Sequence, residues 1–295
     1  METEATLKER YARQTILHEI GEAGQQKLAK AKVLVIGLGG LGSPVCMYLS
    51  AAGVGRIGIL DRDIVEIENI HRQIIHSSVD VSKSKVNSAK NKMNNINPNI
   101  IIDDYFYALT DANAVDIIQN YDFVIDATDN FSTKFLVNST CVATNTPFSH
   151  GGVLKHRGQS MTIIPHKSAC FACAFSDNID SVKSSFNAGL LGVTPGIIGC
   201  IQASEAIKYF LGIGDLLTDT LLTMDMLGLN FEKIALEKNP NCPVCGGSKD
   251  APIESNIESK NDIDSAILES SDVEADSSDV LETSSSEILE AKDGT

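Results

Sequence analysis

The segment Gly37-Leu-Gly-Gly-Leu-Gly42 has residue types and a spacing suited to binding a nucleotide. It follows an apolar run and precedes a helical pattern, so its backbone can approach a phosphate group at the amino end of that helix. Asp61 ends the next apolar run, 19 residues after Gly42, where a carboxylate can accept hydrogen bonds from ribose hydroxyls. We therefore predict that Gly37, Gly39, Gly40, Gly42 and Asp61 bind a cofactor.

The cofactor of such a loop is either NAD or ATP, and three residues further along the chain favour ATP. When a carboxylate attacks the α-phosphorus of ATP, charge builds up on the departing pyrophosphate and must be neutralised by cations. Arg72 and Lys85 suit that role, and Asp129, at the end of another apolar run, suits a Mg²⁺ ligand. An NAD-dependent oxidoreductase would leave these three residues without a purpose.

Two C-x-x-C pairs predict a structural metal site. Their thiolates, from Cys170, Cys173, Cys242 and Cys245, can surround one zinc ion tetrahedrally and leave no open position for catalysis. A redox C-x-x-C would explain one pair but not both. The other cysteines, Cys46, Cys141 and Cys200, lie in apolar helical patterns, where we expect small core residues. We assign no catalytic role to any of the six histidines.

Alternating strand and helix patterns surround the glycine loop. They predict a Rossmann-type, doubly wound and mostly parallel sheet, with an antiparallel extension after residue 150. The expected strands are 31–37, 56–61, 99–106, 122–129, 150–155, 159–165 and two around 219–236. The expected helices are 5–30, broken by Gly21 and Gly24, then 43–53, 82–95, 111–120, 131–144 and 197–211.

Composition divides the chain of 295 residues into three parts. We expect an N-terminal helical segment (1–30), an adenylation domain with the zinc site (31–248), and a disordered, acidic, serine-rich tail (249–295). Residues 250–295 carry 14 acidic and two basic side chains, which is −12 of the total charge of −15. The remainder is nearly neutral, so its charge argues neither for nor against a nucleic-acid partner, and we expect no direct one. The sequence has neither a signal peptide nor a membrane span, and we expect a cytoplasmic protein.

Taken together, these motifs resemble the MoeB/ThiF/HesA family, which is related to ubiquitin-activating enzymes. The resemblance covers about residues 8–247. Besides the glycine loop, Lys85 and the cysteine pairs, it rests on Arg10-Tyr-Ala-Arg13-Gln14, Asn69-Ile-His-Arg72-Gln73, Asp126-Ala-Thr-Asp129-Asn130 and Gln202-Ala-Ser-Glu205-Ala-Ile-Lys208.

The resemblance implies roles for further residues. It places Asn69, Arg72 and Lys85 at the phosphates, with Gln73 and Asn130 also at the nucleotide, and makes Asp129 the magnesium ligand. It also implies a homodimer in which Arg13 reaches the partner subunit's site. The catalytic residues expected from it are Arg13, Arg72, Lys85 and Asp129.

The implied reaction is ATP-dependent adenylation of the C-terminal Gly-Gly carboxylate of a small ubiquitin-like sulfur-carrier protein. Pyrophosphate would leave, and an external sulfur donor would then displace AMP, in molybdopterin, thiamine or thiolated-tRNA synthesis. Many relatives carry an acyl-accepting cysteine where this chain has Ser185, which puts thioester transfer there in doubt. The same fold could instead activate a small-molecule or tRNA-borne carboxylate, or serve as a non-catalytic dimeric scaffold.

Overall fold

The computed structural model describes residues 3–175 and 189–246 of the chain. All of them belong to one compact unit, residues 1–253. The predicted acidic tail and Ser185 lie outside the described residues. None of the helices in the described ranges is long and apolar enough to cross a membrane.

Eight strands form one sheet in the order β3-β2-β1-β4-β5-β6-β7-β8. Strands β3, β2, β1, β4 and β5 are parallel, and β5, β6, β7 and β8 pair antiparallel. This arrangement confirms the mostly parallel sheet with an antiparallel extension. The strands are β1 Lys32–Ile36, β2 Arg56–Leu60, β3 Ile101–Tyr105, β4 Phe123–Asp126, β5 Phe148–Leu154, β6 Arg157–Ile163, β7 Thr220–Asp225 and β8 Asn230–Ala235.

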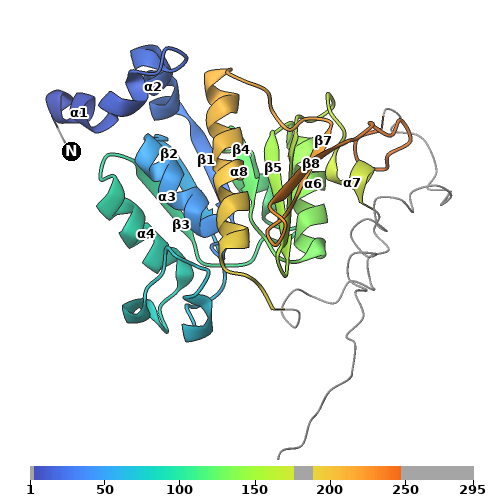
Figure 1. Cartoon of the computed structure of the whole chain (residues 1–295), viewed down its shortest axis with the longest axis horizontal. Coiled ribbons are helices and arrows are strands. Elements are labelled where there is room, and N and C mark those ends of the chain that lie inside the picture. The colour runs from blue at the N-terminus through green and yellow to red at the C-terminus, as the bar shows by residue number, and fades with distance from the viewer. Residues whose placement is uncertain (1–2, 176–188, 247–295) are drawn as a thin grey trace, which may run out of the picture. The chain divides into compact units, whose positions relative to one another are not determined.

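Helices cover both faces of the sheet. In Figure 1, α3 and α8 lie in front of the strands and α6 lies behind them. The helices are α1 Glu4–Thr15, α2 Gly21–Lys30, α3 Gly42–Ala52, α4 Lys85–Ile96, α5 Ala114–Ile118, α6 Phe131–Thr144, α7 Phe171–Ala174 and α8 Val193–Leu211. Short 3₁₀ helices span Ile67–Asn69 and Ser78–Asp80.

Burial explains the uninterrupted apolar runs of the central strands. Val33 and Val35 of β1 and Phe123 and Ile125 of β4 have no exposed surface. Each such side chain contributes about 1.5–3 kcal/mol when it leaves water. The strands that flank the glycine loop are therefore held by fully buried side chains.

Several boundaries differ from the sequence prediction. The expected N-terminal helix is two helices, and α2 begins at Gly21, whose φ of +56° suits glycine. Helix α8 begins four residues earlier than residue 197, because Pro195 is tolerated in a first turn. Strand β4 ends at Asp126 and not at Asp129, because the Asp126 carboxylate binds the backbone N–H of Thr128 and closes a turn.

Candidate active site

The glycine loop joins β1 to α3 as a tight turn. Gly37 has a φ of +95°, and a Cβ there would lie 2.6 Å from the carbonyl oxygen of Ala127. A Cβ on Gly42 would lie 1.9 Å from the carbonyl oxygen of Gly37, so neither position accepts a side chain. Gly40 packs against Pro195 of α8, whereas a Cβ on Gly39 would meet nothing nearer than 3.8 Å. The loop is therefore tightly packed on the protein side and open at Gly39.

Asp61 follows β2 and is bonded to the glycine loop. Its Oδ2 accepts a hydrogen bond of 2.7 Å from the backbone N–H of Leu38, and its Oδ1 accepts one of 2.8 Å from that of Asp63. Burial raises the pKa of Asp61 above its usual value, although the Lys85 charge and the two N–H groups oppose this. Each oxygen keeps a lone pair for a further donor, as binding a ribose requires.

Asn69 and Gln73 are buried beside the loop. The Asn69 Oδ1 accepts a hydrogen bond of 3.1 Å from the backbone N–H of Glu66 and so fixes the 3₁₀ turn. The Gln73 Nε2 is the atom closest to where a Cβ on Gly39 would stand. Its Oε1 is buried and has no hydrogen-bond partner among the described residues. The Gln73 amide is thus held at the open side of the loop with bonding capacity to spare.

The two predicted phosphate-binding cations have protein partners. Lys85 is buried, and its Nζ lies 3.0 Å from Asp63 Oδ2. The Arg72 Nη1 donates to the carbonyl oxygen of Glu68 at 2.9 Å and lies 2.8 Å from His71 Nε2. Arg72 belongs to the β2–α4 connection, and Lys85 is the first residue of α4, where its charge acts on Asp61.

Asp129 lies in the turn between β4 and α6. Ala127, two residues before it, donates its N–H to Ile36 of β1 at 2.9 Å and places its carbonyl against Gly37. Asp129 and Asn130 are exposed, and the Asn130 Oδ1 accepts a hydrogen bond of 2.9 Å from the N–H of Thr133, capping α6. The fold therefore brings Asp129 to the edge where the glycine loop and Asp61 lie.

These features fit a nucleotide and its metal ion. Helix α3 starts at the loop and no side chain caps its first turn, so its amide groups and dipole face the ligand position. Asp129 offers an exposed carboxylate, the ligand that Mg²⁺ prefers. Arg13 lies away from the glycine loop of its own chain. It is exposed on α1, and α1 contacts the far end of α3, where Gln14 Nε2 donates to the carbonyl oxygen of Ala52.

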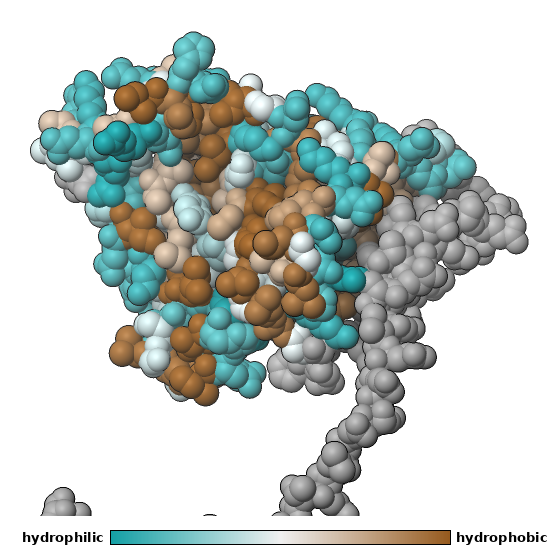
Figure 2. Space-filling model, viewed as in Figure 1, coloured by the Kyte–Doolittle hydropathy of each residue, from teal (hydrophilic) through white to brown (hydrophobic). Residues whose placement is uncertain are grey.

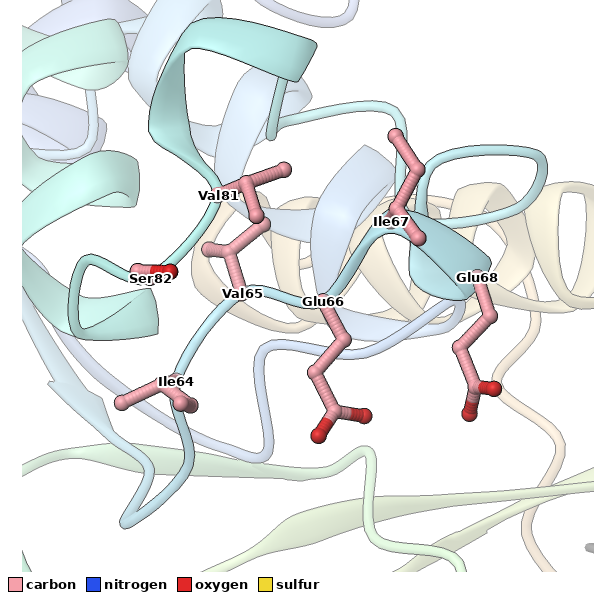
Figure 3. Close-up of a pocket in the computed structure, with 7 residues that line it drawn as sticks. All are labelled: Ile64, Val65, Glu66, Ile67, Glu68, Val81 and Ser82. Atoms are coloured by element: carbon pink, nitrogen blue, oxygen red, sulfur yellow. The ribbon is translucent and has the colours of Figure 1, made fainter.

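A separate hollow of about 490 Å³ lies in the β2–α4 connection (Figure 3). Val65 and Val81 face one another in it, while Glu66 and Glu68 extend outward with their carboxylates on the same side. Two carboxylates repel a triphosphate. The hollow is therefore unsuited to a triphosphate; it is lined by Ile64, Val65, Glu66, Ile67, Glu68, Val81 and Ser82.

The four predicted zinc ligands form one buried cluster. The sulfur atoms of Cys170 and Cys173 are 3.8 Å apart, those of Cys170 and Cys242 3.6 Å, and those of Cys173 and Cys245 3.4 Å. All four lie within 4.8 Å of one another. Tetrahedral bonds of about 2.3 Å to one zinc ion place sulfur atoms about 3.8 Å apart, so the cluster fits that ion. The cluster joins α7 to the segment after β8.

The remaining cysteines only partly match the prediction. Cys46 and Cys141 are fully buried, and burial raises the pKa of each thiol. Cys200 is exposed, so the expectation that it fills the core was wrong. Helix α8 is apolar around most of its circumference, and sequence spacing cannot show which of its apolar faces the sheet covers.

Known proteins resemble this chain over most of its length. The model of the ThiF family matches residues 11–244. The chain belongs to the ThiF family. A relative within it is the sulfur carrier protein adenylyltransferase of Thermus thermophilus, 40% identical over 245 residues, which cover 81% of this chain and 90% of the relative. The SAMP-activating enzyme E1 of Haloferax volcanii is 37% identical over 263 residues, covering 88% and 94%.

Other relatives of this ThiF-family chain are longer. The adenylyltransferase and sulfurtransferase MOCS3-1 of Zea mays is 42% identical over 241 residues, which cover 80% of this chain and 51% of the relative. Among solved structures, Escherichia coli MccB has a TM-score of 0.73 at 25% identity, covering 84% of this chain and 75% of MccB. Its complex with ATP has a TM-score of 0.71 at 24% identity, over 80% and 74%, and shows the shared fold.

Three buried polar residues beside the site were not selected from the sequence. Asp126, Lys134 and His150 form a hydrogen-bonded cluster directly behind the Asp129 turn. Asp126 does stand in the Asp-Ala-Thr-Asp segment, where a carboxylate at the end of a fully buried strand is a detectable signal. Lys134 and His150 carry no such signal, because the start of α6 brings Lys134 to Asp126 and the pairing of β4 with β5 brings His150 there.

Proposed function

We propose that this chain adenylates the C-terminal Gly-Gly carboxylate of a small ubiquitin-like sulfur-carrier protein, with ATP as the second substrate and release of pyrophosphate. The observation that carries the proposal is the meeting of the glycine loop, Asp61, Gln73 and Asp129 at the carboxyl edge of β1, β2 and β4. A relative named as a sulfur carrier protein adenylyltransferase, 40% identical over most of both chains, supports the same reaction.

Each residue of the site has a separate role in binding ATP and the metal ion. The glycine loop and the start of α3 hold phosphate, and Asp61 holds ribose. Mg²⁺ at Asp129 would supply charge neutralisation for the leaving pyrophosphate. Arg72 and Lys85 add positive charge at the same side. Because Lys85 is paired with Asp63, we expect its ammonium to divide its hydrogen bonds between Asp63 and the nucleotide.

Exchange of labelled pyrophosphate into ATP tests the reaction. The protein should catalyse exchange only with both Mg²⁺ and a carrier ending in Gly-Gly, and Asp129→Ala should reduce the rate at least about 100-fold, the size typical of losing a group that stabilises transition-state charge. Asp116→Ala on α5, which also removes an exposed aspartate, is the matched control and should leave the rate unchanged. Exchange without a carrier, or an unaffected Asp129→Ala, would refute the mechanism. Preferential binding of NADH would favour an oxidoreductase.

The homodimer with Arg13 acting across the interface is part of the same proposal. Helix α1 contacts the end of α3 that lies about 16 Å from the glycine loop, given a rise of about 1.5 Å per residue, so Arg13 is poorly placed for its own site. Figure 2 shows apolar side chains gathered over α3 and α8 on the face toward the viewer. Tyr48, 58% exposed, belongs to α3, and Ile197 and Ile201 of α8 are half-buried. A second copy would cover this face.

Mixed dimers test the interface. Arg13→Ala and Asp129→Ala should each be inactive alone. An equal mixture, allowed to exchange subunits, should regain about a quarter of wild-type activity, because half of the dimers then contain one intact site. A mixture that stays inactive, although sedimentation shows mixed dimers, would refute action across the interface.

The later steps are also proposals. Because Ser185 occupies the place of the acyl-accepting cysteine, we propose that the carrier adenylate is attacked directly by an external sulfur donor. The supporting observation is the chemistry of the hydroxyl, which needs a dedicated base to become a nucleophile. Zinc at the four cysteines would have a structural role, since four thiolates leave no open coordination position.

A further inference from the structure

A buried charged cluster lies directly behind the candidate magnesium ligand. The Asp126 Oδ2 accepts hydrogen bonds from Lys134 Nζ at 3.2 Å and from His150 Nδ1 at 2.9 Å. The side chains of Asp126 and His150 are 1% exposed and that of Lys134 is 6% exposed. Lys134 also donates to the carbonyl oxygen of Gly151 at 2.7 Å. Such a cluster is costly to bury and holds its members in one geometry only when its bonds are satisfied.

On one side the cluster fixes the turn that carries Asp129. The second carboxylate oxygen of Asp126, Oδ1, accepts from the N–H of Thr128 at 3.1 Å and from its hydroxyl at 2.6 Å. Lys134 lies in the first turn of α6, which Asn130 caps. Asp126 therefore binds residues both before and after Asp129 in the chain, namely Thr128 and Lys134.

On its other side the cluster contacts the segment 170–173, which we call the zinc knuckle. The His150 ring centroid lies 4.7 Å from that of Phe171 and 6.0 Å from that of Phe175. Phe171 stands between Cys170 and Cys173 in the chain, and its N–H is bonded at 3.0 Å to Asn138 of α6. The knuckle and the Asp129 turn are separated by one side chain, His150.

The hydrogen bonding of His150 is defined by its surroundings. Burial, assisted by the Lys134 charge and opposed by Asp126, lowers the pKa of His150 to about 4. The ring is then neutral at physiological pH, and Nδ1 donates its hydrogen to Asp126. The buried Nε2 has no hydrogen-bond partner among the described residues. The ring therefore acts in two ways, as a donor to Asp126 and as an apolar surface for Phe171.

We propose that His150 is a positioning residue through which the zinc knuckle fixes the Asp126–Asn130 turn and so orients Asp129 toward the bound nucleotide. The inference rests on the proposed role of Asp129 as magnesium ligand. A residue that only packs against its neighbours affects the stability of the fold alone. A positioning residue also affects how strongly Mg²⁺ increases the affinity for ATP.

Two variants separate the two contacts of the ring. His150→Phe keeps an aromatic ring against Phe171 and removes the donor to Asp126. His150→Asn keeps an N–H donor near the place of Nδ1 and removes the ring. Thr162→Val is the matched control, because Thr162 is equally buried and its hydroxyl donates at 2.6 Å to buried Glu205, which is not a member of the Asp126 cluster.

The measurement is calorimetric titration of the zinc-loaded protein with ATP, in Mg²⁺ and in EDTA, without any carrier. The ratio of the two affinities reports the metal contribution. We expect His150→Phe to lower this ratio about fivefold or more and His150→Asn to lower it about threefold, with zinc content unchanged and affinity in EDTA within about twofold. Thr162→Val should lower the melting temperature and leave the ratio within about twofold of the wild type.

Three results would overturn the proposal. One is an unchanged ratio in His150→Phe. Another is a wild-type ratio in His150→Asn, which would show that the knuckle does not act through the ring. The third is a wild-type ratio in Asp129→Ala, because Asp129 would then not bind Mg²⁺ and there would be no metal ligand for His150 to position. Failure of the wild type to exchange pyrophosphate with the carrier would refute the proposed function, and the titration would still decide the role of His150.

Discussion

Replacing Lys134 by methionine tests the physical account of the buried cluster. The substitution keeps a long flexible side chain and removes the ammonium that lies 3.2 Å from the Asp126 carboxylate. Asp126 would then be a buried carboxylate whose remaining partners are His150 and Thr128. The carbonyl oxygen of Gly151 would also lose its donor.

Burial sets the expected size of the effect. With both side chains less than a tenth exposed, removal of one partner should cost about 3–5 kcal/mol of unfolding free energy. For a domain of this size that corresponds to a fall in melting temperature of about 6–20 °C. Lys90→Met is the matched control, because Lys90 and Asp104 form an ion pair whose side chains are 37% and 40% exposed. An exposed pair contributes only about 0–1 kcal/mol.

The effect should also depend on pH. In the wild type burial raises the pKa of Asp126, but Lys134 and the hydrogen bonds outweigh it and hold the pKa well below its usual range. This stabilisation is present above the unfolded-state pKa of about 3.9 and is lost as the pH falls through the folded-state value. Without Lys134, burial dominates and Asp126 takes up a proton at higher pH.

Urea denaturation at pH 7 and pH 5 measures both effects. We expect the difference in stability between the wild type and Lys134→Met to shrink at pH 5, because protonation relieves the unpaired charge. Lys134→Arg, which keeps the charge, should recover most of the loss. If Lys134→Met is no more destabilising than Lys90→Met at pH 7, the assignment of a buried and mutually dependent ion pair is wrong.

Three further predictions concern the metal site, the glycine loop and the serine. Freshly prepared protein should contain about one zinc per chain; Cys245→Ser should lose it and melt at lower temperature, whereas Cys200→Ser, at an exposed thiol, should do neither. Gly42→Ala should weaken ATP binding at least about tenfold, since its Cβ would collide with a carbonyl oxygen, whereas Gly196→Ala, with open space around it, should not. Ser185→Ala should leave pyrophosphate exchange within about threefold, and trapping of a thiol-labile conjugate with the carrier would contradict direct attack by the sulfur donor.

The sequence determined the sheet and predicted a nucleotide site at the glycine loop. Apolar runs ending in Gly37, Asp61 and Asp126 identify parallel strands, because strands buried on both faces must be apolar throughout. A glycine loop between such a strand and a helix has one common use, so its ligand class could be predicted. The four clustered cysteines could also be predicted from the sequence, since C-x-x-C pairs are local in the chain and each closes its own turn.

Tertiary structure alone decided which distant side chains meet. Residues Asp126 and His150 are adjacent only because β4 and β5 pair in a specific register, and a shift of one residue would turn His150 to the other face of the sheet. The exposure of Cys200 and the distance of Arg13 from its own glycine loop likewise depend on how helices pack, which helical periodicity does not specify. Local patterns fix secondary structure and short motifs, whereas contacts across the sheet depend on register and packing, which no single segment of the sequence encodes.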